Sequence, residues 1–190
     1  SSDLVDSFTE IELRISADVY VTQGKIQKLT IEASKDDLEE IETVVSGNEL
    51  TIKTESWIRN LGTVNIYITM PVIEGFDISG SGKIMAQNDF SVNDIELEVS
   101  GSGDIEIGKI TAKDVDSEIS GSGSITIKDG NCSGLDGEIS GSGKIYAFGL
   151  KANKVDCEIS GSGKCEITAV ERLEADITGS GKIYYKGKPV

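Results

Sequence analysis

Pairs of carboxylates recur along the chain beyond residue 90. In five short segments, two acidic residues flank a single residue of another kind. The ten acidic residues are Glu96 and Glu98, Asp116 and Glu118, Asp136 and Glu138, Asp156 and Glu158, and Glu174 and Asp176. Oxygen ligands of this kind suit Ca²⁺, which takes several hard ligands. The pattern gives a hypothesis of weak Ca²⁺ binding at six of them, which are Asp116, Glu118, Asp136, Glu138, Asp156 and Glu158.

The same carboxylates have a simpler interpretation as a solvated acidic face. Stacked carboxylates about 4.8 Å apart repel each other by roughly 1 kcal/mol even in a water-like dielectric. A flat array of this kind also lacks the carbonyl ligands that strong Ca²⁺ sites use. We therefore favour a face that keeps the protein soluble, and we predict no other cofactor.

Aromatic and sulfur side chains supply the other candidates. Tyr146, Tyr184 and Trp57 could form platforms for sugar rings, although ordinary packing explains isolated aromatics equally well. Cys157 and Cys165 are expected to be buried, with or without a disulfide across the turn between them, and Cys132 is the expected free thiol. The chain has no His, so the commonest general base is absent.

A repeated turn must position these residues. The tetrapeptide Ser/Thr-Gly-Ser-Gly occurs six times, and successive copies start 21, 20, 20, 20 and 18 residues apart. The copies are Ser79–Gly82, Ser100–Gly103, Ser120–Gly123, Ser140–Gly143, Ser160–Gly163 and Thr178–Gly181. Apolar and polar residues alternate before and after each copy, as in Val115-Asp-Ser-Glu-Ile119, which is typical of a strand with one buried face.

This period predicts an all-β fold, a right-handed parallel β-solenoid with rungs of about 20 residues. The inner position in the middle of the strand before each turn is mostly small: Leu97, Ser117, Gly137, Cys157 and Ala175. We expect the two glycines of each turn to have positive φ on both sides of the serine. The turn is therefore architectural, and residues 76–190 are assigned to the solenoid.

Residues 1–75 lack the repeat but remain β-rich, so we predict a capping region continuous with the solenoid. Residues 42–53 read as a hairpin with its turn at residues 46–48. One short helix is expected over Asp36–Thr43, capped by Ser34. At the other end of the solenoid, the final lysines and proline discourage the addition of another strand. Alternatively, that end docks on a second copy of the chain, so the sequence is also compatible with a homo-oligomer.

Charge narrows the range of partners. Asp and Glu number 33 and Lys and Arg 18, which gives a net charge of −15. Such a chain repels nucleic acid, and no apolar stretch approaches the roughly 20 residues of a membrane span. The chain begins at Ser-Ser-Asp-Leu without an apolar leader, which is compatible with a removed signal or a lipid anchor before residue 1.

Four segments carry a family resemblance, namely Asp18–Gly24, Leu29–Ala33, Val64–Pro71 and Ile78–Ile84. In this order they resemble the "putative auto-transporter adhesin, head GIN domain" family, from about Phe8 to Tyr185. The resemblance implies a β-solenoid protein of the bacterial cell envelope, exported to the periplasm or the outer surface. It carries over no catalytic motif.

Three functions remain as hypotheses. The first is a non-enzymatic, adhesin-like envelope protein that binds a glycan or protein on a surface. The alternatives are a polysaccharide-active, pectinase-like β-helix enzyme and a structural self-assembly module. An active site would break the repeat with one unusual rung, whereas these rungs are near-copies of each other, so we predict that the protein is not an enzyme. The sequence does not name the ligand.

Overall fold

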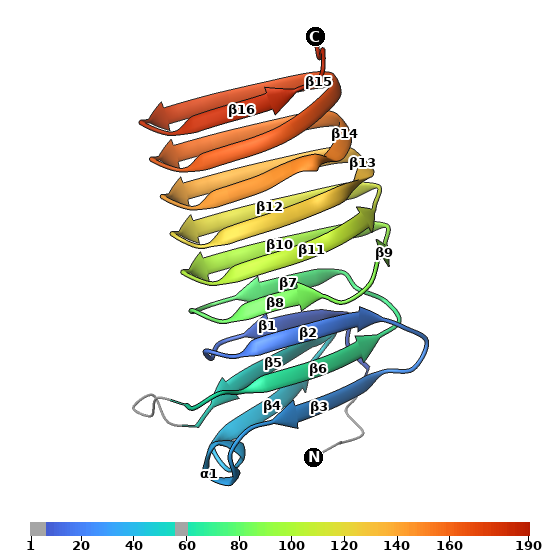
Figure 1. The fold of residues 1–190 in the computed structure, drawn as a ribbon, viewed down its shortest axis with the longest axis vertical. Helices are drawn as coiled ribbons and strands as arrows, with labels where there is room; N and C mark the ends of the chain where they lie inside the picture. The colour runs from blue at the N-terminus through green and yellow to red at the C-terminus, as the bar shows by residue number, and fades with distance from the viewer. Residues whose placement is uncertain (1–6, 56–60) are drawn as a thin grey trace.

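The computed structural model describes residues 7–55 and 61–190. This part of the chain forms sixteen strands and one short helix. The elements are β1 (Glu10–Leu13), β2 (Asp18–Gln23), β3 (Lys28–Glu32), α1 (Lys35–Leu38), β4 (Ile41–Ser46), β5 (Glu49–Thr54), β6 (Asn65–Met70), β7 (Gly75–Ile78), β8 (Lys83–Ala86), β9 (Phe90–Ser91), β10 (Asp94–Gly101), β11 (Asp104–Thr111), β12 (Asp114–Gly121), β13 (Ser124–Gly141), β14 (Lys144–Gly161), β15 (Lys164–Gly179) and β16 (Lys182–Lys186). The strands join into one sheet that coils around a single core (Figure 1).

The repeat region is a coil with two walls, which meet at the Ser/Thr-Gly-Ser-Gly corners. The first wall consists of β7, β10, β12 and the second halves of β13, β14 and β15. The second wall consists of β8, β11, the first halves of β13, β14 and β15, and β16. Neighbouring coils pair in parallel, so the predicted β-solenoid is confirmed.

The core is built from columns of residues that lie in register between coils. Ile105, Ile125 and Ile145 stack in the second wall, and each is fully buried. The column of mostly small residues in the first wall is in register as predicted, and it lets the opposite wall approach. A Cβ placed on Gly137 would lie 3.4 Å from Cδ1 of Ile145. Each coil therefore buries its apolar face against the next.

The two glycines of a corner have different roles. Gly121 has φ +144°, and a Cβ there would lie 2.4 Å from the carbonyl oxygen of Gly101 one coil below. The prediction of positive φ is wrong for the second glycine, since Gly123 does not have it. Gly123 is needed because its Cβ would lie 2.3 Å from the oxygen of Gly103, where backbones of successive coils stack closely.

The N-terminal region continues the coil, but not in chain order. β1 lies between β5 and β7, and β2 lies between β6 and β8, as Figure 1 shows. β3 and β4 then add to the two walls in the antiparallel direction. The predicted hairpin is confirmed as β4 and β5, with Gly47 at φ +65° in its turn. The antiparallel strands and α1 close this end of the stack.

The helix is shorter than predicted. Ser34 is its N-cap as expected, and its Oγ accepts a hydrogen bond from the backbone N–H of Asp37 at 3.1 Å. The helix ends at Leu38 instead of Thr43, because residues 41–46 pair with β5. Their β-branched side chains suit a strand, and pairing with the sheet outweighs the local helical signal.

Candidate functional site

The ten paired carboxylates form two columns on the outside of the first wall. Glu96, Asp116, Asp136, Asp156 and Glu174 are in register in one column. Glu98, Glu118, Glu138, Glu158 and Asp176 are in register in the other. We call them the acidic columns. The alternation in the sequence predicted this arrangement, and a buried residue separates the two carboxylates in every coil but the last, where Ala175 is exposed.

Few cations neutralise the acidic columns. Among the described residues, Glu174 is the one member with an ion pair, which its Oε2 makes with Nη2 of Arg172 at 2.7 Å. Lys113 is close to the columns in sequence, but its Nζ lies 3.0 Å from Oδ2 of Asp114 and 3.9 Å from Oδ1 of Asp94, which flank the columns. The central carboxylates therefore face one another without a described cationic partner.

The close spacing of like charges affects the pKa values of the carboxyl groups in the columns. Burial raises the pKa of Glu98 to about 7, and a hydrogen bond with Glu96 and the charge of Asp77 add to the shift. Burial also raises the pKa of Asp116 and of Asp136, and neighbouring carboxylates strengthen both effects. These groups therefore hold protons more readily than free carboxylates do, because both burial and the neighbouring negative charges disfavour the ionised form.

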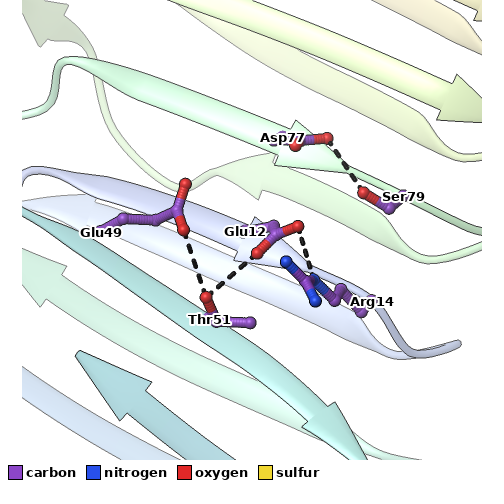
Figure 2. A network of polar contacts seen from close by, with 6 residues as sticks. All are labelled: Glu12, Arg14, Glu49, Thr51, Asp77 and Ser79. Carbon is purple, nitrogen blue, oxygen red and sulfur yellow. Dashed lines mark hydrogen bonds and ion pairs between the residues drawn. The ribbon is translucent and has the colours of Figure 1, made fainter. Parts of the chain in front are cut away.

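The column continues toward the N-terminal end through Glu12 and Asp77, where a polar network forms (Figure 2). The Nε atom of Arg14 donates to Oε1 of Glu12 at 2.6 Å, and Oγ1 of Thr51 lies 3.0 Å from Oε2 of the same residue. Burial raises the pKa of Asp77, with Glu12 and Glu49 adding to the shift. Sequence patterns did not single out this network, since Arg14 precedes the repeats.

Shallow hollows lie along the first wall. One of about 440 Å³ is bordered by Glu10, Val72 and Glu96, and one of about 330 Å³ by Asp136, Asp156 and other residues. Within residues 7–55 and 61–190, no group of three or more Asp, Glu, Cys or His side chains is arranged to hold a metal ion. The carboxylates spread along the wall instead of converging, and Ca²⁺ binding at the six named residues stays a prediction.

The second wall carries a different surface near the C-terminus, which we call the tyrosine–lysine patch. It consists of outward residues of β14, β15 and β16: Lys144, Tyr146, Phe148, Lys164, Glu166, Lys182, Tyr184 and Lys186. The Nζ atom of Lys164 lies 5.3 Å from the ring centroids of both Tyr146 and Tyr184, and 2.5 Å from Oε1 of Glu166. The Nζ atom of Lys186 lies 4.2 Å from the ring centroid of Phe148.

The structure thus brings together two of the three aromatic residues proposed from the sequence. Tyr146 and Tyr184 stand two coils apart in one column, with Glu166 between them. Trp57 lies outside the described residues. The same column also holds Tyr20 and Tyr67 near the N-terminal end, and their rings stack with centroids 5.1 Å apart. The sequence analysis did not single out the lysines of the patch, although a lysine directly follows each of the last three corners.

The three cysteines are buried free thiols. Cys157 and Cys165 are unbridged, and their contact raises the pKa of Cys165, with burial adding to the shift. Burial also raises the pKa of Cys132 to about 12, so this thiol is unreactive at neutral pH. The expectation that Cys132 is free is confirmed.

Fold and surface together define a class of protein, a β-solenoid whose coils present two long regular faces. The chain belongs to the family described as "Putative auto-transporter adhesin, head GIN domain", whose model matches residues 7–189. The comparison with curated proteins gives no match. In the described residues, no helix has the length and apolar character needed to cross a membrane.

Solved structures support the fold assignment. A "putative adhesin" from Bacteroides fragilis is 26% identical, with a TM-score of 0.92, and the match covers 100% of this chain and 88% of that chain. A "putative lipid binding protein" from Parabacteroides distasonis is also 26% identical, with a TM-score of 0.83 and coverage of 100% and 89%. A "putative adhesin" from the same species is 24% identical, with a TM-score of 0.78 and coverage of 100% and 90%.

Proposed function

We propose that this protein is a non-enzymatic, adhesin-like protein of the bacterial cell envelope that binds an anionic glycan on the tyrosine–lysine patch. The observation that carries the proposal is the row of Tyr146, Lys164 and Tyr184, in which one ammonium group lies 5.3 Å from two exposed or half-exposed rings. Four lysines gather here, although the whole chain has a net charge of −15.

The chemistry of the patch suits a sugar chain. Tyrosine faces pack against the apolar faces of sugar rings, and their hydroxyls can hydrogen-bond to sugar hydroxyls. Tyr146 and Tyr184 are two coils apart, a separation of about 9.6 Å along the stack and about the length of a disaccharide. Lys144 and Lys182 flank this row and can donate to a carboxylate or phosphate of the ligand.

The acidic columns support a binding role more than a catalytic one. Their carboxylates recur on every coil of an open wall, whereas a glycoside hydrolase places one pair on either side of the bond that it cleaves. The pectinase-like alternative therefore has less support. The family and its solved relatives, which are described as adhesins or as a lipid-binding protein, also favour surface binding and a location in the envelope.

A glycan array with the wild-type protein and two double variants tests the proposal. We expect binding to glycans that carry carboxylates or phosphates, weakened by salt, and lost in Tyr146→Ala/Tyr184→Ala. Tyr20→Ala/Tyr67→Ala is the matched control, since it removes two tyrosines from the same column far from the lysines of the patch, and it should bind as the wild type does. A blank array for the wild-type protein, or unchanged binding by Tyr146→Ala/Tyr184→Ala, would refute the proposal.

A further inference from the structure

The C-terminal end of the solenoid leaves a coil uncovered. In the described part of the chain, the second half of β15 pairs only with β14, and β16 pairs only with β15. Inner positions that are buried one coil earlier are open here: Ile159 is 2% exposed and Ile177 43%, while Ile167 is 1% exposed and Tyr185 57%. An unpaired edge beside an open core is a template for adding another strand.

The two ends of the stack differ in this respect. At the N-terminal end, antiparallel β3 and β4 complete the two walls, and α1 lies beside them (Figure 1). At the C-terminal end, the last residues lie at the far corner, where the N–H of Val190 donates to the carbonyl of Glu171. They leave residues 173–178 open, as the exposure of Ala175 and Ile177 shows.

We propose that this end binds a second copy of the chain, C-terminal end to C-terminal end, around a two-fold axis parallel to the strands. Such an axis exchanges the two walls, so β15 of each copy meets β16 of the other and the strands run antiparallel. Ser180 in the corner Thr178–Gly181 fixes the register, because residues at equal distances from Ser180 lie at the same level along the strands. Thr178 then faces Lys182 of the second copy, and each contact occurs twice.

The side chains fit this register on both faces of the joined sheet. On the outside, Glu174 faces Lys186 of the second copy, and Asp176 lies beside Lys182 and Lys186 of that copy. On the inside, Ile177 faces Ile183 of the second copy, and the small Ala175 faces its large Tyr185. Opposite charges and complementary volumes at facing positions stabilise paired strands.

The other two-fold arrangement is disfavoured. An axis perpendicular to the walls would pair β15 with β15 of the second copy and would place Glu174 against Asp176. Like charges directly opposite each other destabilise paired strands. Charge complementarity therefore selects the pairing of β15 with β16, and the acidic columns of one copy continue into the lysine-bearing wall of the other.

Sedimentation of the 190-residue chain tests the dimer. We expect a dimer for the wild-type protein, and a dissociation constant that is higher by about tenfold or more in Glu174→Lys and in Lys186→Glu. The double variant Glu174→Lys/Lys186→Glu should recover the dimer, because the facing charges are exchanged. Glu118→Lys makes the same change of charge in the middle of the wall and should leave the dimer intact.

A second measurement guards against variants that fail to fold. Hydrogen exchange of a peptide covering residues 172–186 should slow as the wild-type concentration rises, while exchange in β12 stays constant. Ile177→Asp places a charge on the open core and should abolish both the dimer and this change. A wild-type monomer at all concentrations, or a dimer that survives both Ile177→Asp and Glu174→Lys, would overturn the proposal.

Discussion

The Nε atom of Arg14 lies 2.6 Å from Oε1 of Glu12, and this contact secures a carboxylate that is only 6% exposed. The next positions of the same column belong to Asp77 and Glu98, and no ion pair is formed by either within the described residues. Burial raises the pKa of both groups, and the charges of neighbouring carboxylates add to the shift. In the first coil an ion pair therefore stabilises the carboxylate of the column, unlike in the two coils that follow.

Replacing Arg14 should therefore destabilise the fold. Arg14→Met leaves Glu12 buried beside other carboxylates, and we expect the free energy of unfolding to fall by about 1–3 kcal/mol. Arg172→Met is the control, because both partners of the Arg172–Glu174 pair are 63% exposed and such pairs contribute below about 1 kcal/mol. Urea unfolding of both variants measures the difference. Equal losses would contradict the special role of Arg14.

The acidic column should make stability depend on pH. The pKa of Glu98 is about 7 in the folded protein and about 4.3 in an unfolded chain. Between these values the folded state binds more protons, so stability is greatest at the acidic end and falls as pH rises to about 7. We expect Glu98→Gln to raise the melting temperature at pH 8 and to flatten this decline.

The melting temperature from pH 5 to pH 8 measures this effect in both proteins. Glu39→Gln is a suitable control, because Glu39 is exposed at the end of α1 and lies 3.9 Å from Lys35 instead of beside a carboxylate. A decline that is equally steep in Glu98→Gln and in the wild type would show that Glu98 is not its source.

The sequence predicts the repeated coils because two periods act together. Alternation places Ile119 inside and Glu118 outside, and the recurrence of the corner sets the register between coils. A slip by one residue would turn every apolar side chain outward, so the register follows from burial alone. For this reason the acidic columns and the core columns could be predicted without the structure.

The order of the N-terminal strands could not be predicted in the same way. β1 and β7 alternate equally well, and nothing in their spacing indicates that β5 and β7 enclose β1. Pairing between remote segments depends on the whole core. The position of Lys164 between two tyrosines has the same origin, because it depends on side-chain conformations across three coils. The lysines that follow the corners were its only local signal.

The hydroxyl of Ser117 offers a test of the core. Ser117 is 3% exposed, and its Oγ has no hydrogen-bond partner among the residues that the structure describes. A buried polar atom without a partner costs about 1–3 kcal/mol, so Ser117→Ala should stabilise the protein by about 1 kcal/mol. Thermal unfolding measures this gain, with Ser162→Ala at an exposed corner position as a neutral control. A loss of stability would indicate that the hydroxyl has a partner in solution.

Calcium that binds the central part of the acidic columns should stabilise the folded protein. We expect millimolar Ca²⁺ to raise the melting temperature more than NaCl of equal ionic strength, because a divalent cation can bridge carboxylates of neighbouring coils. Asp136→Asn/Asp156→Asn should remove this difference, and Asp36→Asn/Glu39→Gln, which also removes two charges, should keep it. Identical shifts for both salts in the wild-type protein would reject the calcium hypothesis.

Two glycines of the first wall should respond to alanine in opposite ways. At Gly121 the backbone has φ +144° and a Cβ would lie 2.4 Å from the oxygen of Gly101, so Gly121→Ala should cost several kcal/mol. At Gly137 a Cβ meets Ile145 and Cys157 at ordinary contact distances, 3.4 and 3.8 Å. Gly137→Ala should therefore stabilise the protein by about 0.4–1 kcal/mol through the entropy of the unfolded chain. Unfolding both variants in urea compares them directly. A destabilised Gly137→Ala would mean that the small column leaves no room between the walls, and a tolerated Gly121→Ala would mean that the corners can adopt another turn.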